Sequence, residues 1–148
     1  MPQEIEGTEL VEYNGTTYAH IIWAEARVDV TTFISQSESS FQFGLLAHEA
    51  GFKEPAHYHQ PFIREIKDLQ QMFVVQRGVV AVELYADNGE LLREIIMKTG
   101  DAIVLIHGVH AIRVIEDMQC ISVKQGPFLG TEKDKVMVRV KARNDSSL

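Results

Sequence analysis

The sequence has a single cysteine, Cys120, among 148 residues, so no disulfide can form within the chain. Cys120 lies in the alternating stretch MQCISVKQG, which is typical of a half-buried strand position. Free cysteine is commonly a buried packing residue, and a reactive thiol is the less favoured alternative. We therefore expect Cys120 to fill space in the core and the fold to depend on the burial of apolar side chains.

The sequence also lacks a long apolar run and an excess of basic residues. No run approaches the roughly 18 residues of a membrane helix. The first ten residues, MPQEIEGTEL, have neither the basic nor the apolar region of a secretion signal. The formal net charge of -7 disfavours binding to a phosphate backbone. We therefore expect a cytoplasmic protein with neither a membrane nor a nucleic-acid partner.

Length and composition are those of one globular domain, because 148 residues with 45% hydrophobic and 24% charged residues suffice for one core. We expect an N-terminal edge strand and a polar linker over residues 1–40. The main domain is expected over residues 41–140, and a polar tail over residues 141–148. The expected edge strand is TTYAHIIWAEARV, and the linker includes SQSESS.

Apolar residues after residue 41 alternate with a period of two or form short β-branched runs, and no window keeps a helical period over three turns. Short turns separate most of these runs, and Asp87-Asn88-Gly89 is typical of a hairpin turn because Asn and Gly tolerate positive φ. The sequence therefore predicts an all-β sandwich or barrel. The expected strands are FQFGLLAHE, QQMFVVQ, VVAVELYA, LLREIIM, AIVLIH, HAIRVI and QCISVKQ.

Two histidines, His57 and His59, are separated by one residue in the stretch EPAHYHQPF. On an extended strand, residues two apart share a face and lie about 6.6 Å apart, so two imidazoles can reach one ion. A further nitrogen donor is available from His107 or His110 in LIHGVHAIRV. Imidazole binds zinc, iron and nickel, which makes a metal site one interpretation. A pair without function on the surface is the other.

The residues around the histidine pair resemble the first sequence motif of the cupin superfamily. In that motif a glycine is followed, after five residues, by His-x-His and then by a carboxylate, six residues and a second glycine. Here Gly51, His57, His59, Gln71 and Gly78 stand at these places. The chain departs from the pattern in having glutamine in place of glutamate and a longer gap between His59 and Gln71.

The second cupin motif is resembled by Gly100 and the stretch DAIVLIHGVH. The usual proline is replaced by Ile106, and His110 comes one residue early. His110 begins an alternation with Ile112 and Val114 that would point one face inward, so we prefer it to His107 as the third ligand. His107 is then expected near the metal or facing the substrate.

The resemblance implies a cupin double-stranded β-helix, which is a jelly-roll barrel, and a homodimer in which TTYAHIIWAEARV is a candidate exchanged edge strand. It also implies one divalent transition metal, such as zinc, iron, nickel or manganese. The ligands would be His57, His59, Gln71 and His110, with His57 and His59 as the candidate catalytic residues. Because the Gln71 amide does not neutralise charge, the ion would be more Lewis acidic and less tightly held than one with a carboxylate ligand.

Several functions are compatible with this resemblance, since the cupin fold carries many activities. The first is a metal-dependent enzyme that isomerises, or moves a proton on, a small carbohydrate or keto acid. The second is a metal-free isomerase of nucleotide-linked keto sugars, and the third is a binding module without chemistry. The stretch VKQGPFLGTEKDKV resembles small cupins associated with polysaccharide synthesis. A dioxygenase is disfavoured because the site lacks the carboxylate of oxygen-activating iron enzymes.

The inner face of the expected barrel would be lined by Phe73 and Val75, which suits a small organic ligand and equally suits a packed core. His48 is expected to be structural, although it can also face the cavity. Arg64 follows the histidine pair in an irregular stretch, where it can meet an anionic ligand or be a solvated surface residue.

Overall fold

The computed structural model describes residues 4–141, and strands dominate it, which confirms the prediction of an all-β fold. The polar tail was expected over residues 141–148, and residues 142–148 lie outside the described part of the chain. The elements are β1 (Thr8–Tyr13), β2 (Thr16–Ile22), β3 (Thr32–Phe33), β4 (Gly44–Leu45), β5 (Gln71–Tyr85), β6 (Leu91–Met97), β7 (Ala102–Leu105), β8 (Val109–Lys124) and α1 (Thr131–Asp134).

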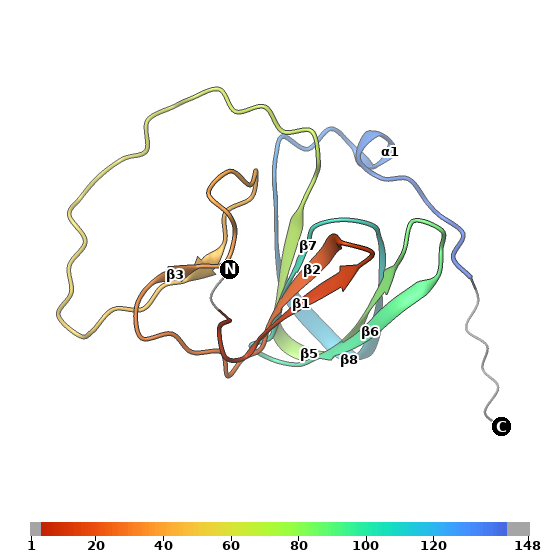
Figure 1. The fold of residues 1–148 in the computed structure, drawn as a ribbon, viewed down its shortest axis with the longest axis horizontal. Helices are drawn as coiled ribbons and strands as arrows, with labels where there is room; N and C mark the ends of the chain where they lie inside the picture. Colours follow the sequence, from red (N-terminus) through yellow and green to blue (C-terminus); the bar gives the residue numbers. More distant parts are fainter. Residues whose placement is uncertain (1–3, 142–148) are drawn as a thin grey trace.

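Six strands form one antiparallel sheet in the order β1-β2-β7-β5-β6, and β8 pairs with the other edge of β5. The first part of β5 pairs with β7 and its last part pairs with β6, while β8 runs along both parts. As a result the sheet curls into a half-barrel (Figure 1). Strands β3 and β4 form a separate two-stranded sheet to one side.

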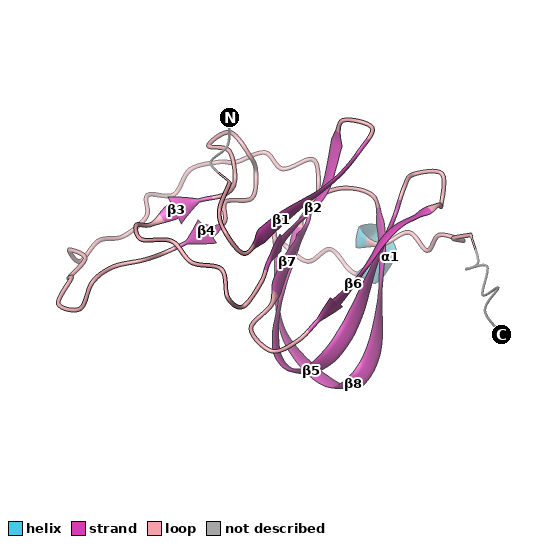
Figure 2. Ribbon diagram, turned by 60° about the horizontal axis from the view of Figure 1, so that its bottom comes forward, coloured by secondary structure: helices cyan, strands magenta, loops and turns pink. Residues whose placement is uncertain are grey.

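The bend in β5 and β8 lies where their register shifts, between Val75 and Val80, and Figure 2 shows the two strands turning together there. Gly78 sits inside this bend with a φ of +84°. A Cβ atom at Gly78 would overlap the carbonyl group of Asp117 on β8. Only glycine therefore permits both the left-handed backbone and the close approach of the two strands.

Apolar side chains are buried on both faces of the curled sheet. On the concave face, Val75, Val82, Ile95, Met97 and Ile103 belong to the larger cluster of buried residues. The smaller cluster lies on the opposite face, where Phe43 and its neighbours cover Ile22, Ala102 and Val104. Alternation of side chains along each strand explains why consecutive residues such as Ile103 and Val104 contribute to different clusters.

The turn between β6 and β7 is fastened to two other parts of the sheet. The side chain of the buried Asp101 accepts hydrogen bonds from the backbone N–H groups of Lys98 and Ala24, at 2.8 Å and 2.9 Å. The Gly100 N–H donates to the carbonyl of Val75, at 2.8 Å. The turn over Lys98 to Asp101 therefore supports the start of the bend in β5.

The sequence misplaced several strand boundaries. Two pairs of expected strands are continuous, because QQMFVVQ and VVAVELYA form β5 and HAIRVI and QCISVKQ lie in β8. The expected strand FQFGLLAHE is reduced to β4, and residues 46–70 contain no strand. The expected edge strand is also an interior one, because β2 lies between β1 and β7. Strands β1 and β2 thus belong to the main sheet, which begins well before residue 41.

In the described part of the chain, no helix combines the length and the apolar character needed to cross a membrane.

Replacing Gly78 with alanine should destabilise the fold by more than the left-handed conformation alone. That conformation costs a non-glycine residue about 1–2 kcal/mol, and in Gly78→Ala the methyl group must also displace the Asp117 carbonyl. Gly15→Ala is the control, because Gly15 has a φ of +75° but no atom within 4 Å of an added Cβ. Urea unfolding would measure both losses, and equal losses would contradict the role assigned to Gly78.

Stability should fall with acid partly because of His20 on β2. The ring is half-buried and packs against Phe43, with centroids 5.3 Å apart, and this burial lowers the pKa of His20 while Glu12 opposes the shift. Below the ordinary pKa of about 6.5 the unfolded chain binds more protons here than the folded chain, so stability decreases as the pH falls. His20→Gln should flatten the decline of the melting temperature between about pH 7 and pH 5. An unchanged slope of melting temperature against pH in His20→Gln would contradict this role of His20.

Candidate functional site

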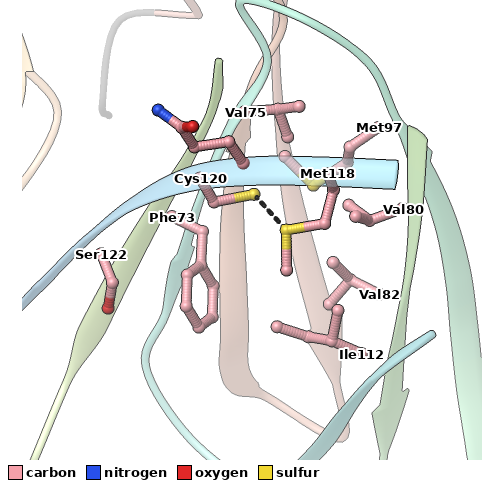
Figure 3. Close-up of a pocket in the computed structure, with 10 residues that line it drawn as sticks. Phe73, Val75, Val80, Val82, Met97, Ile112, Met118, Cys120 and Ser122 are labelled. Atoms are coloured by element: carbon pink, nitrogen blue, oxygen red, sulfur yellow. Dashed lines mark hydrogen bonds between the residues drawn. The ribbon is translucent and has the colours of Figure 1, made fainter. Parts of the chain in front are cut away.

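An apolar cavity of about 300 Å³ lies on the concave face of the half-barrel. Phe73 and Val75 from β5 line it, as the sequence predicted, together with Val82 of the same strand. Figure 3 shows them facing side chains from β8, including Ile112 and Met118. Because few polar atoms reach this cavity, it suits the apolar part of a ligand. Its lining residues are Phe73, Val75, Val80, Val82, Met97, Ile112, Met118, Gln119, Cys120 and Ser122.

Cys120 lines the same cavity with its sulfur 3.4 Å from the sulfur of Met118 (Figure 3). The side chain is half-buried, and burial raises the pKa of the Cys120 thiol. A raised pKa keeps the thiol protonated at neutral pH, and the thiol is much less nucleophilic than the thiolate. Cys120 therefore has the packing role that its place in the sequence indicated.

A second cavity, of about 600 Å³, lies at the mouth of the half-barrel. We call it the mouth cavity; it is lined by the start of β5, the turn between β7 and β8, the end of β8, and residues 134–138. Gln71, His107 and His110 all line it, so the structure brings these three predicted residues into one space. Its lining residues are Asp68, Leu69, Gln71, Leu105, Ile106, His107, Gly108, Val109, His110, Lys124, Asp134, Lys135, Val136, Met137 and Val138.

His110 is the histidine of the mouth cavity that is best suited to remain neutral. Desolvation lowers its pKa, and the ammonium group of Lys135 lowers it further. Part of the residue is still open to solvent, so the desolvation is incomplete, but both causes act in the same direction. An unprotonated imidazole can accept a proton or bind a metal ion.

His107 is engaged with neighbours of its own chain. Its Nε2 atom lies 3.1 Å from the Asp87 carboxylate, and its ring packs edge-on against Tyr18 with centroids 5.2 Å apart. Gln71 is also held, since its amide Nε2 donates a hydrogen bond to the Ser122 hydroxyl at 2.8 Å. The bond fixes the amide so that its oxygen remains available as an acceptor.

His57 and His59 lie in the exposed stretch between β4 and β5 and not on a strand, so the predicted strand geometry of the pair is wrong. Their ring centroids are nevertheless 5.3 Å apart. The Nδ1 atom of His57 lies 2.9 Å from the carbonyl oxygen of Pro55, and an oxygen of that kind only accepts. Nδ1 must therefore carry a hydrogen, and Nε2 lies 3.7 Å from a carboxylate oxygen of Glu54. In the neutral ring Nε2 keeps its lone pair, as a metal-binding histidine requires, whereas a protonated ring would form an ion pair with Glu54.

The four predicted metal ligands do not meet within one chain. Gln71 and His110 line the mouth cavity, whereas His57 and His59 are not among its lining residues. Among residues 4–141, no group of three or more His, Cys, Asp or Glu side chains is placed to hold one ion. The chain thus offers a pair of imidazoles in one place and an imidazole with an amide in another.

Two other residues singled out by the sequence lie outside both cavities. His48 stacks on Phe52 with ring centroids 3.8 Å apart and an interplanar angle of 8°, and its Nε2 atom lies 3.4 Å from the Thr31 hydroxyl. Arg64 is exposed, in the same stretch as the histidine pair. The structure favours the structural interpretation of His48 and gives Arg64 no place in either cavity.

Sequence reasoning noted Lys124 beside a turn that could form the barrel mouth, but it assigned no role to the basic residues of the mouth cavity. Lys124 pairs in register with Gln71 and so shares its face of the sheet, and its ammonium nitrogen lies 5.0 Å from the centre of the Phe128 ring. Lys135 follows the short helix α1. The strand register would have revealed Lys124, but no periodicity reveals that residues 134–138 return to the mouth.

Comparison with family models, with curated proteins and with solved structures finds no match to this chain.

Proposed function

We propose that this chain is a small cupin-like protein that binds a small carbohydrate or keto acid at the mouth of its half-barrel and moves a proton on it. The curled antiparallel sheet is compatible with a double-stranded β-helix, and the two motif resemblances favour one. The observation that carries the proposal is His110, an imidazole with a lowered pKa, which lines a cavity of about 600 Å³ together with Lys124 and Lys135.

The chemistry follows from these three side chains. Neutral His110 removes a proton from a carbon next to the carbonyl group of the ligand, and the electron pair moves onto the carbonyl oxygen. An ammonium group of Lys124 or Lys135 stabilises the negative oxygen that forms. Where the deprotonated carbon carries a hydroxyl group, the hydroxyl proton passes to the enolate oxygen, and the protonated imidazole returns the abstracted proton to the former carbonyl carbon. The carbonyl group and the hydroxyl group thus change places without net oxidation. In a ligand without this hydroxyl the proton returns to the same carbon, which exchanges the proton only. A positioned base of this kind contributes about 10²–10⁴-fold in rate.

A divalent transition metal forms the second part of the proposal. In its neutral form His57 would coordinate such an ion through Nε2, because its Nδ1–H is held by the Pro55 carbonyl. The Glu54 carboxylate lies 3.7 Å from Nε2, and the His59 ring lies beside it. Two imidazoles leave open positions, to which Gln71 and His110 would add an oxygen and a nitrogen. When bound, the ion would polarise a carbonyl oxygen of the ligand.

Two alternatives differ in chemistry. A binding module without turnover would use the same two cavities. The apolar cavity would hold one part of the ligand and the mouth cavity the other. A dioxygenase is less well supported, because Gln71 stands where a carboxylate ligand is expected and its amide is held by Ser122. The presence or absence of proton exchange separates the first alternative from the main proposal.

Metal binding should depend on the histidine pair. The purified protein, prepared without a metal-affinity resin, is expected to bind about one Zn²⁺ per chain, and His59→Ala should lose most of it. His48→Ala is the matched control, because His48 is an exposed histidine of the same region that stacks on Phe52 and has no place in the predicted site. Elemental analysis after dialysis measures the occupancy. Full occupancy in His59→Ala would contradict the assignment.

Proton transfer should be visible as isotope exchange. A panel of simple keto acids and nucleotide-linked keto sugars is incubated with the protein in heavy water, and NMR detects deuterium next to a carbonyl group. At least one compound should exchange, and His110→Gln should reduce the rate by about 10²-fold or more, while His48→Ala leaves it unchanged. Binding without exchange would favour the binding module, and neither binding nor exchange would refute the proposed ligand class.

A further inference from the structure

Strand β8 leaves one long edge of the sheet unpaired. It is 16 residues long and pairs with β5 along its length, but within residues 4–141 no strand pairs with its other edge. Its backbone N–H and C=O groups on that side are therefore available to another strand. Six large apolar side chains of β8 are also exposed: Ile112, Val114, Ile115, Met118, Ile121 and Val123.

A second unpaired element is the stretch that carries the histidine pair. We define residues 54–69 as the histidine segment; every residue in it is exposed. Tyr58 is 81% exposed and Ile63 is fully exposed, which is unusual for large apolar side chains in a soluble protein. Figures 1 and 2 both show the stretch between β4 and β5 looping away from the main sheet.

We propose that the histidine segment of one copy pairs along the open edge of β8 in a second copy, and that the two copies exchange these segments about a twofold axis. This inference deepens the proposed function and rests on it where the metal site is concerned. His110 lies near the start of β8, so a strand added along that edge passes beside it. The exchange would bring the partner's histidine pair to the edge that holds His110, and so assemble ligands that one chain keeps apart.

The exposed apolar surface is large enough for such a dimer. A fully exposed aromatic side chain presents roughly 150–250 Å² and an aliphatic one less, so the exposed fractions on β8 and on the histidine segment together amount to roughly 600–1,000 Å² at one contact. A twofold dimer contains this contact twice. The total then reaches the 1,200–2,000 Å² or so that stable interfaces bury, before any new backbone hydrogen bond is counted.

A second copy is the occupant that fits both elements at once. Each chain carries one open edge and one unpaired extended segment, and reciprocal exchange satisfies both in a closed pair. A different protein on β8 would leave the histidine segment uncovered. Closure of the segment on its own β8 would leave the protein a monomer, and the tests below distinguish that arrangement.

The first test is the oligomeric state of the full chain, measured by light scattering at micromolar concentrations. The wild type should be a dimer. Ile63→Asp and Val114→Asp, one on each side of the contact, should each give a monomer with an unchanged circular dichroism spectrum, because both side chains are largely exposed within one copy. Val30→Asp is the matched control, since Val30 is 69% exposed elsewhere, and it should stay dimeric. A monomeric wild type, or dimers in both contact variants, would overturn the exchange.

The second test asks whether one zinc site draws on two chains. One variant, His57→Ala with His59→Ala, lacks the histidine pair, and the other, His110→Ala, lacks the opposite ligand. Refolded together, they should form mixed dimers with one complete site, so that about a quarter of the wild-type zinc is recovered by statistical pairing. The readout is zinc retained against a chelator that strips either variant alone. If the site lies within one chain, the mixture recovers no zinc, and the exchange is overturned.

The two tests separate the exchange from the proposed function. If the wild type holds no zinc but both contact variants dissociate, the exchanged interface stands and the metal part of the proposed function fails. If the wild type holds zinc as a monomer, the metal site stands and the exchange fails.

Discussion

The pairing of β5 with β8 is the interaction on which the rest of the half-barrel depends. The two strands are the longest in the chain, and they bend together at a register shift that Gly78 makes possible. Because they bend, β5 borders β7 in its first part and β6 in its last part, and the sheet curls without a second layer. The same bend places Phe73 and Val82 on opposite walls of one apolar cavity.

Much of the fold was predictable because strand formation here is driven by local alternation. The turn at Asn88-Gly89 matches its sequence signal, with Gly89 at a φ of +84° and the Asn88 side chain accepting the N–H of Glu90 at 3.0 Å. The residues between β4 and β5 were mispredicted because a strand also needs a partner. Pro55 and Pro61 flank the histidine pair and have no N–H group to donate, which excludes a central strand and leaves only an edge position, where that side of the backbone faces solvent.

The candidate site was predictable only in part, for a related reason. Gln71 and His110 belong to strands whose register the alternation fixes, and both line the mouth cavity. His57 and His59 depend on a segment that no contact of the sheet positions, so their spacing in the sequence gave their mutual proximity but not their distance from His110. The sequence indicated no role for Lys124 and Lys135, because the cavity that they line is built from four separate parts of the chain.

The open edge of β8 has only part of the usual protection of an edge strand. Charged side chains and bulges discourage pairing at such an edge, and two acidic residues, Glu116 and Asp117, are exposed where the register of β8 shifts. Arg113 is instead engaged with its own sheet, where its guanidinium lies 3.0 Å from the carboxylate of Glu94 and 3.9 Å from that of Glu83. Apolar side chains are exposed on either side of the acidic pair, while the net charge of -7 keeps separate molecules apart only at long range. A complementary strand would shield these apolar side chains from water, and the histidine segment is the stretch that we propose for that role.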